Sequence, residues 1–365
     1  MKYRAKSNIV LYFLVLGIWL ITVLLKLKYN GFVFGFDYGL YHPDGALYAT
    51  RAFDWSGYTE TESAKIVSDW YNIHAFKFNN TKPSDLYYSV NPFYPEYSPR
   101  ILYPLLSIPF VKLFGVPGML AVPALSLLIL LLVILKIGID LNKPFIAFLT
   151  LVSVASSSTI VRWMMANTTD ALLTGIFSVT AYCLVRKISS YRWYLAFGVL
   201  VILTGLTRIS ILFWIAVASV LLTQKNYRKV IFITVTSLLI VTPTLLVNSS
   251  NSFLAVEADR SLWQRFLLYP FYLIKITFYE FAQLFVMDRI LFFLCALSIY
   301  FSFKYIHKYS SRYLLIVLFA GLLTGAMNGT VGVNFRYQLP VIAFICWSII
   351  DNTNISLNSF LRRSK

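Results

Sequence analysis

The residue best placed for chemistry is Asp44, in a stretch over residues 35–49 that is rich in glycine and aromatic residues. Pro43 fixes the backbone before it, and Gly45 after it allows a close backbone approach. The sequence therefore predicts that Asp44 stands at the start of a helix running through Arg51. Because aspartate is also a preferred N-cap residue, the stretch alone leaves two roles open, a reactive carboxylate or a simple helix cap.

Isolated arginines occur in three later turns between apolar runs. Arg162 and Asp170 bracket the first turn, Arg208 lies in the second, and Arg336 opens the last apolar run. A charge at membrane depth is costly and usually faces an aqueous cavity or a partner, although snorkelling to the interface explains any single arginine equally well. Three such turns, together with an acidic segment around Asp44, favour one outward-facing site that binds an anion.

The chain that must position these residues is too apolar for a soluble protein. Of its 365 residues, 58% are hydrophobic and 13% are charged, whereas about a quarter of the residues of an ordinary globular chain are charged. The net charge is +17, but the basic residues are scattered between apolar runs, and nucleic-acid binding requires a contiguous basic face. We expect an all-α polytopic membrane protein, one integral-membrane domain over residues 1–365, with membrane lipids around it and no nucleic-acid partner.

Ten apolar runs are long enough, at least marginally, to cross a bilayer as helices, which takes about 20 residues. The runs are 8–26, 117–135, 144–161, 171–186, 193–207, 209–223, 230–247, 289–304, 312–331 and 337–351. The first run follows Lys2, Arg4 and Lys6 and is not followed by a small-residue cleavage site. We therefore interpret it as an uncleaved helix and not as a signal peptide.

The basic residues alternate between the connecting segments. The segments on the N-terminal side of the predicted bundle hold several Lys or Arg each, whereas the short segments on the other side hold Arg162, Arg208 or Arg336 alone. Short cytoplasmic loops keep positive charge. The alternation therefore predicts that both termini are cytoplasmic and that the three arginines lie on the outer side.

Two long segments fall on the outer side of this arrangement, residues 27–116 and 248–288. The first holds more than half of the acidic residues, and we expect it to form a folded cap that includes a juxtamembrane helix over 101–114. The second contains an apolar stretch over 266–287 that also carries charged residues. We interpret this stretch as an amphipathic helix in the outer interface and not as an eleventh span.

Several short motifs resemble those of the membrane glycosyltransferases with the GT-C fold. Asp44-Gly45-Ala46-Leu47-Tyr48-Ala49 looks like the D-E-x-x-Y-A stretch of the protein O-mannosyltransferases and of the aminoarabinose transferases that act on lipid A. Similar to later motifs of these enzymes are Arg100 to Gly115, Thr168 to Leu173, Gly205 to Arg208, and Arg336-Tyr337 with Pro340. The resemblance covers roughly the first 215 residues and the last helix. The chain departs from it at Gly45, where the motif has a second acidic residue, and after the tenth predicted helix, where larger members continue.

The resemblance implies an enzyme of the bacterial cytoplasmic membrane with its active site on the outer face. The donor would be a sugar linked through phosphate to a polyprenol, and the acceptor a glycan, a lipid or a protein. Asp44 is then the expected general base of an inverting displacement, and Asp170 is expected to orient acceptor or sugar hydroxyls. Arginines can neutralise a phosphate leaving group, and the candidates are Arg100, Arg208, Arg289 and Arg336. Further residues expected to contact substrate are Tyr48, Arg162 and Tyr337.

The histidines give no support for a metal site. His42, His74 and His307 show no ligand spacing, so we interpret them as solvated surface residues. The sequence predicts no certain cofactor and no metal ligands, and a divalent metal stays open without a ligand set to support it.

Two other functions stay open. A transporter or flippase for a polyprenyl-linked or other anionic substrate would use the arginines to guide that substrate through the bundle. It predicts charged or helix-breaking positions near mid-membrane, and the sequence shows few of these apart from Pro123 and Pro243. A membrane assembly or polymerase component would instead recognise polyprenyl-linked glycans without this donor chemistry.

Overall fold

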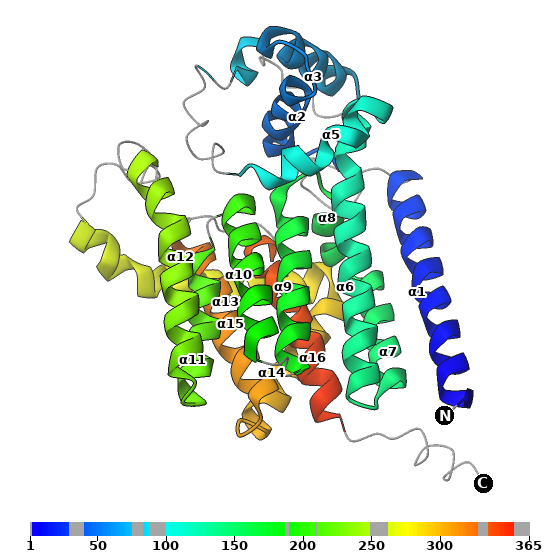
Figure 1. Cartoon of the computed structure of the whole chain (residues 1–365), viewed down its shortest axis with the longest axis vertical. Coiled ribbons are helices and arrows are strands. Elements are labelled where there is room, and N and C mark those ends of the chain that lie inside the picture. Colours follow the sequence, from blue (N-terminus) through cyan, green and yellow to red (C-terminus); the bar gives the residue numbers. More distant parts are fainter. Residues whose placement is uncertain are drawn as a thin grey trace.

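The computed structural model describes residues 2–28, 40–74, 83–87, 89, 100–186, 190–208, 210–248, 262–327 and 335–353. Within these ranges every regular element is a helix and no strand occurs, which confirms the predicted all-α class. The long helices form a bundle, and a group of shorter helices lies over one end of it (Figure 1).

The helices of the bundle coincide with the ten apolar runs of the sequence. They are α1 (Lys2–Lys28), α6 (Ala121–Asp140), α7 (Pro144–Ser156) with α8 (Ser158–Met165), α9 (Thr169–Val185), α10 (Ser190–Thr207), α11 (Ile211–Thr223), α12 (Tyr227–Asn248), α14 (Arg289–Lys304), α15 (Tyr309–Met327) and α16 (Ile342–Asn352). The predicted run 337–351 starts as a 3₁₀ helix, η4 (Arg336–Val341), before α16 begins. Helix positions therefore follow from the apolar pattern, while the form of their first turns does not.

Few of these helices are long enough to span a membrane on their own. Among the described residues, two helices are long and apolar enough, Ile9–Lys28 in α1 and Val116–Asp140, in which η2 (Val116–Leu120) continues into α6. The bent pair of α7 and α8 makes a third if both count as one span. Other apolar helices, such as α9 and α11, are shorter. The chain is thus helical and compatible with a membrane, and ten spans with cytoplasmic termini stay a prediction.

Short helices between α1 and α6 form the predicted cap. They are α2 (Pro43–Trp55), α3 (Glu60–His74), η1 (Pro83–Leu86) and α5 (Leu102–Phe114). α2 packs against both α3 and α5, and α5 coincides with the helix predicted over 101–114. The cap lies at the end of the bundle that is opposite to the N-terminal end of α1 (Figure 1).

The predicted interfacial stretch over 266–287 is a single long helix, α13 (Leu262–Met287). It packs against α15 and α14, so it belongs to the helical assembly. Whether it lies in the interface stays a prediction, and residues 249–261 of the same segment lie outside the described residues.

α9 and α16 run through the centre of the bundle. Nearly all their residues are buried, and a helix that is covered on all sides must be apolar all round. α9 packs against α6, α10 and α16, and α16 also packs against α14 and α15. Because α9 starts at the cap end and η4 leads into α16 from that end, Asp170 and Arg336 are held beneath the cap.

The helix predicted over 144–161 is broken in two, which corrects that prediction. α7 and α8 meet at Ser157, and their axes differ by 71°. The buried carboxylate of Asp288 closes the break: its Oδ2 accepts from Ser157 Oγ at 2.6 Å and from the Thr159 N–H at 2.8 Å, and its Oδ1 accepts from the Leu291 N–H at 3.0 Å. One side chain thus replaces the backbone partners that the first turns of α8 and α14 lack.

We expect Asp288→Ala to destabilise the fold, because three donors lose a charged acceptor while staying buried. Each buried donor left unpaired costs about 1–3 kcal/mol, so the melting temperature in detergent should fall clearly. The matched control is Asp140→Ala, which removes a partly exposed pair with Lys136 and should change the free energy of unfolding by less than about 1 kcal/mol. Equal melting temperatures of the two variants would contradict the capping role of Asp288.

Candidate active site

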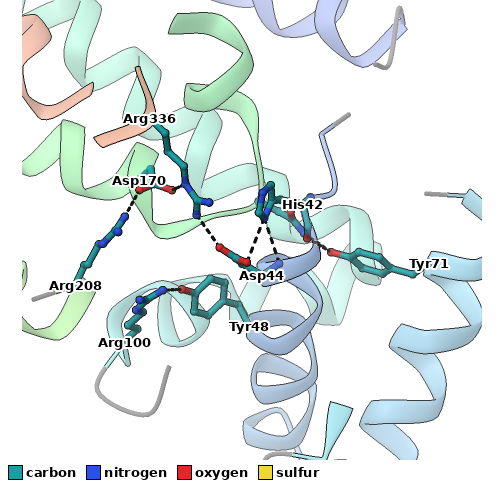
Figure 2. Close-up of polar contacts among 9 residues, drawn as sticks. His42, Asp44, Tyr48, Tyr71, Arg100, Asp170, Arg208 and Arg336 are labelled. Carbon is teal, nitrogen blue, oxygen red and sulfur yellow. Dashed lines mark hydrogen bonds and ion pairs between the residues drawn. The ribbon is translucent and has the colours of Figure 1, made fainter. Parts of the chain in front are cut away.

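Three helix starts meet beneath the cap, and each carries one residue of the candidate site. Asp44 lies in the first turn of α2, Asp170 in the first turn of α9, and Arg336 is the first residue of η4. Figure 2 shows the three side chains pointing toward one another from separate elements. Segments that are far apart in the sequence therefore supply one cluster of charges.

Arg336 joins the two aspartates. Its Nη2 donates to Oδ2 of Asp44 at 2.7 Å, and its Nε donates to Oδ2 of Asp170 at 2.7 Å. Arg208 donates from Nη1 to the other oxygen of Asp170 at 2.6 Å. The four side chains form a continuous ion-paired chain in the order Asp44, Arg336, Asp170, Arg208 (Figure 2).

Aromatic rings lie against the guanidinium groups of this chain. The guanidinium carbon of Arg336 is 5.1 Å from the centroid of the Trp163 ring, and that of Arg208 is 4.6 Å from the Tyr337 ring. Both distances suit a cation–π contact. Tyr337, which the sequence analysis selected, thus lies beside the cluster and packs against the guanidinium group of Arg208.

The ion-paired chain is largely removed from water. The side chain of Asp170 is 2% exposed, that of Arg336 10%, and that of Asp44 20%. Removing charges from water costs several kcal/mol per ion, and the attraction between the paired charges often does no more than offset this desolvation penalty. A buried chain of four charges is therefore explained better by function than by stability. Asp44 is the carboxylate that a bound molecule can reach.

The charge state of Asp44 is set by its neighbours. Burial by itself would raise the pKa of this carboxyl, but the Arg336 guanidinium and the adjacent His42 outweigh that effect and hold the pKa well below its usual range. Asp44 is therefore ionised at neutral pH. A carboxylate with so low a pKa is a weak base, and it becomes a better one when the charge of Arg336 is shared with another anion.

His42, and not Asp44, is the N-cap of α2. Its Nδ1 accepts the Asp44 N–H at 3.3 Å, and its side chain is 14% exposed. The interpretation of His42 as a solvated surface residue is therefore wrong, whereas His74 and His307 are exposed. The carboxylate of Asp44 is left available for Arg336, which excludes the N-cap role; the role as a reactive carboxylate stays a prediction.

Asn167, which the sequence analysis did not select, locks α2 against the turn between α8 and α9. Its side chain is fully buried. Oδ1 accepts the His42 N–H at 2.7 Å, Nδ2 donates to the Tyr71 hydroxyl at 2.5 Å, and the Asn167 N–H donates to the Leu40 carbonyl at 2.9 Å. These bonds fix the distance between the helix starts that carry Asp44 and Asp170.

The Asn167 side chain leaves no room for a larger residue at position 45, where the chain has Gly45 and the glycosyltransferase motif has a second acidic residue. A Cβ atom at position 45 would overlap the side-chain amide of Asn167. The space that the second acidic residue of the motif would need is therefore occupied. Any role that a carboxylate has there in other enzymes is not available to this chain.

Arg100 reaches the site through Tyr48. Its Nη1 donates to the Tyr48 hydroxyl at 2.7 Å, and Tyr48 is 2% exposed. Burial raises the pKa of Tyr48, although the charge of Arg100 acts in the opposite direction. The buried ring packs edge-on against Tyr103 at 5.4 Å, so Tyr48 supports Arg100 and offers no open face to a substrate.

Glu280 on α13 holds the residue before Arg336. Its buried carboxylate accepts the Phe335 N–H at 2.5 Å. Phe335 has a left-handed backbone with φ 66°, a conformation that costs energy in a non-glycine residue and needs support. Nothing in the sequence links residue 280 to residue 335, because they meet only when α13 packs against α15.

Arg289 and Arg162 are predicted site residues that make none of the ion pairs of this cluster. Arg289 is exposed at the start of α14, and none of the contacts found among the described residues joins it to the cluster, so its role as a phosphate ligand stays a prediction that no contact supports. Arg162 is half-buried, and its guanidinium carbon lies 5.5 Å from the Trp163 ring. The guanidinium groups of Arg162 and Arg336 therefore lie near the same ring.

The described residues contain no group of three His, Cys, Asp or Glu side chains that could hold a metal ion. Both oxygens of Asp170 and one oxygen of Asp44 are bound by arginines. The arrangement as it stands is suited to binding an anion through guanidinium groups.

We expect Gly45→Ala and Asn167→Ala to be strongly non-additive. Gly45→Ala overpacks the Asn167 amide, which should cost about 1–3 kcal/mol, and Asn167→Ala leaves buried donors and acceptors unpaired at a similar cost. The double variant removes the overlap, so it should be more stable than the sum of the single changes by about 0.5–3 kcal/mol. Unfolding in detergent measures all three free energies.

The control for this double-mutant comparison is Gly17→Ala in α1, where a Cβ atom meets nothing within 4 Å. It should not be destabilised, because alanine is the better helix former. Additive effects of Gly45→Ala and Asn167→Ala would contradict the close approach of these two residues.

Comparison with known proteins provides no relative for this chain. No protein-family model, no curated protein and no solved structure matches it. A function for this chain is therefore inferred from the contacts described above and from the motif resemblance.

Proposed function

We propose that this chain is a membrane glycosyltransferase of the GT-C type that moves a sugar from a polyprenyl-phosphate donor to an acceptor hydroxyl. The observation that carries the proposal is the Arg336 bridge between Asp44 and Asp170 beneath the cap. Each of the five resembling motifs supplies a side chain to this region, and they are Asp44, Arg100, Asp170, Arg208 and Arg336. That these motifs, scattered over the chain, meet in one region is what a shared site requires, and this supports the proposal.

The arginines bind the donor phosphate in this proposal. The bond between the anomeric carbon and the phosphate oxygen breaks, and polyprenyl phosphate leaves with the electron pair. This leaving group needs its charge neutralised but no proton, and guanidinium groups fixed beforehand provide that neutralisation. Arg208 and Arg336, already oriented by Asp170 and by aromatic rings, are the phosphate ligands, and Arg100 lies near them behind Tyr48.

Asp44 accepts the proton of the acceptor hydroxyl as its oxygen attacks the anomeric carbon. The ion pair with Arg336 keeps Asp44 weakly basic before the donor binds. When the donor phosphate shares the Arg336 charge, the basicity of Asp44 increases. Donor binding and activation of the base are thereby coupled through one guanidinium group, which limits transfer to the state in which the donor is present.

Asp170 holds the two arginines in this scheme. Arg208 and Arg336 occupy its two carboxylate oxygens, and its side chain is 2% exposed. A direct contact with sugar or acceptor hydroxyls, as expected from the resemblance, would have to displace one of these arginines. Positioning the phosphate ligands is therefore the role that its geometry supports.

A transporter is the second candidate, and the broken pair of α7 and α8 is the observation that favours it. Discontinuous helices bind substrates and ions in many transporters, because their free helix ends point at the ligand. Here the start of α8 is already capped by Ser157 and Asp288. An end whose donors are satisfied by protein groups has little left for a substrate, so the enzyme is the better proposal.

Asp44→Asn is expected to abolish transfer while keeping donor binding. The amide cannot accept the proton, and loss of a general base lowers rates by about 10²–10⁴-fold. The assay follows the release of polyprenyl phosphate from a panel of polyprenyl-phosphate-linked sugars in proteoliposomes, with cell-envelope extract as acceptor. Asp69→Asn on the exposed face of α3 is the control and should transfer normally. Unchanged transfer by Asp44→Asn would remove Asp44 as the base.

Polyprenyl phosphate alone tests the phosphate ligands without knowledge of the sugar. Arg208→Gln and Arg336→Gln should each weaken its binding about 10- to 100-fold, since a charge-assisted hydrogen bond contributes about 1.5–3 kcal/mol. Arg289→Gln, which removes an exposed arginine away from the cluster, should change binding less than about twofold. Melting temperatures show whether each variant is folded. Equal affinities of the folded Arg208 and Arg289 variants would contradict the proposed site.

A further inference from the structure

A cavity of about 720 Å³ lies at the end of the bundle that faces away from the cap. Its wall is formed by the last residues of α6, α9 and α16, the turn between α11 and α12, and the start of α15. α9 has Asp170 in its first turn and Val185 in this wall, and at 1.5 Å per residue it separates the two by about 22 Å. The cavity is therefore distinct from the cluster around Arg336.

Lys229 brings an unbalanced positive charge to this cavity. It is half-buried, and its Nζ lies 4.8 Å from the centroid of the Trp193 ring, which also lines the cavity. None of the ion pairs between described residues includes Lys229. A partly desolvated ammonium group without a counter-charge attracts an anion.

Lys308 adds a second cation to the wall, and the carboxylate near it is already engaged. Its Nζ donates to the Asp351 carbonyl at 3.1 Å and lies 3.9 Å from Oδ1 of that residue. Oδ2 of Asp351 accepts from Ser310 Oγ at 2.6 Å. The cavity therefore carries two lysines against one hydrogen-bonded aspartate, and the adjacent segments add exposed basic residues such as Arg228.

Apolar side chains form much of the remaining wall, among them the aliphatic Leu141, Leu184 and Leu221 and the aromatic Trp347, beside polar residues such as Gln224. A bare phosphate ion would leave this surface unfilled, whereas an amphiphile covers it with its apolar part. The sequence predicts that this end of the bundle faces the cytoplasm, and basic pockets between membrane helices on that side suit anionic lipid headgroups. Cations beside a partly apolar wall at this end of the bundle thus point to a phospholipid.

We propose that this cavity binds the headgroup phosphate of an anionic phospholipid, with Lys229 and Lys308 as the phosphate ligands. The bound lipid touches the C-terminal ends of α9 and α16. At its other end, α9 carries Asp170, and α16 is preceded by η4 with Arg336. A ligand that binds only the folded state raises its stability. We therefore expect the lipid to raise the free energy of unfolding of the protein by binding at the end opposite to the candidate active site.

The test uses the full chain purified in a nonionic detergent and measures lipid binding by native mass spectrometry and by the melting temperature. Phosphatidylglycerol should bind at least about tenfold more tightly than phosphatidylcholine and should raise the melting temperature. Lys229→Gln should weaken phosphatidylglycerol binding about tenfold. Arg228→Gln removes the same charge from the exposed neighbouring residue and should change binding less than about twofold.

Three results would overturn the proposal: equal binding of phosphatidylcholine, equal losses in Lys229→Gln and Arg228→Gln, or glycerol 3-phosphate binding as tightly as the lipid. The last result would assign the cavity to a soluble phosphate compound. If Lys229→Gln does not fold, Lys308→Gln replaces it and should weaken phosphatidylglycerol binding by the same factor. A folded Lys308→Gln protein that binds phosphatidylglycerol normally would contradict the proposed site. Polyprenyl phosphate binding should change less than about twofold in Lys229→Gln, so this outcome is independent of the proposed function.

Discussion

The guanidinium group of Arg336 is the interaction on which the arrangement of this protein depends. It binds an aspartate from the cap and an aspartate from the central helix, and the first of these is 292 residues away in the chain. Because a guanidinium presents its donors in a fixed plane, two carboxylates can share it only when α2 and α9 start at the right places. The cap is therefore positioned against the bundle by charge and direction as well as by apolar packing.

Buried polar side chains support this arrangement at each irregular point of the backbone. Asn167 ties the start of α2 to the turn before α9, Glu280 holds the left-handed residue before Arg336, and Asp288 closes the break between α7 and α8. In each case a side chain of a distant segment satisfies backbone donors that a helix end leaves unpaired. Irregular starts are thus fixed as firmly as the regular helices, which is what a site built from helix starts requires.

The two ends of the bundle differ in how they use charge. At the cap end, arginines and aspartates pair with one another almost completely out of water, so that a bound anion must compete for a guanidinium group. At the opposite end, Lys229 and Lys308 border a cavity with a partly apolar wall. The proposed lipid site follows from the weaker pairing at this end, because an anion binds most strongly where positive charge is least compensated. At the cap end, the donor phosphate of the proposed transfer has to compete with Asp44 and Asp170 for the guanidinium groups.

The sequence by itself determined the all-helical class, the places of the bundle helices that the structure describes, and Asp44, Asp170, Arg208 and Arg336 as candidates for one site. Apolar runs and isolated charges are local features, and their meaning can be read without long-range contacts. The tertiary structure decided which charges meet, that Arg289 stands apart, that His42 caps α2, and that Asn167, Glu280 and Asp288 support the site. Those facts depend on contacts between segments far apart in the chain, and an asparagine in a turn or a carboxylate on a long helix has no local pattern that reveals its distant partner.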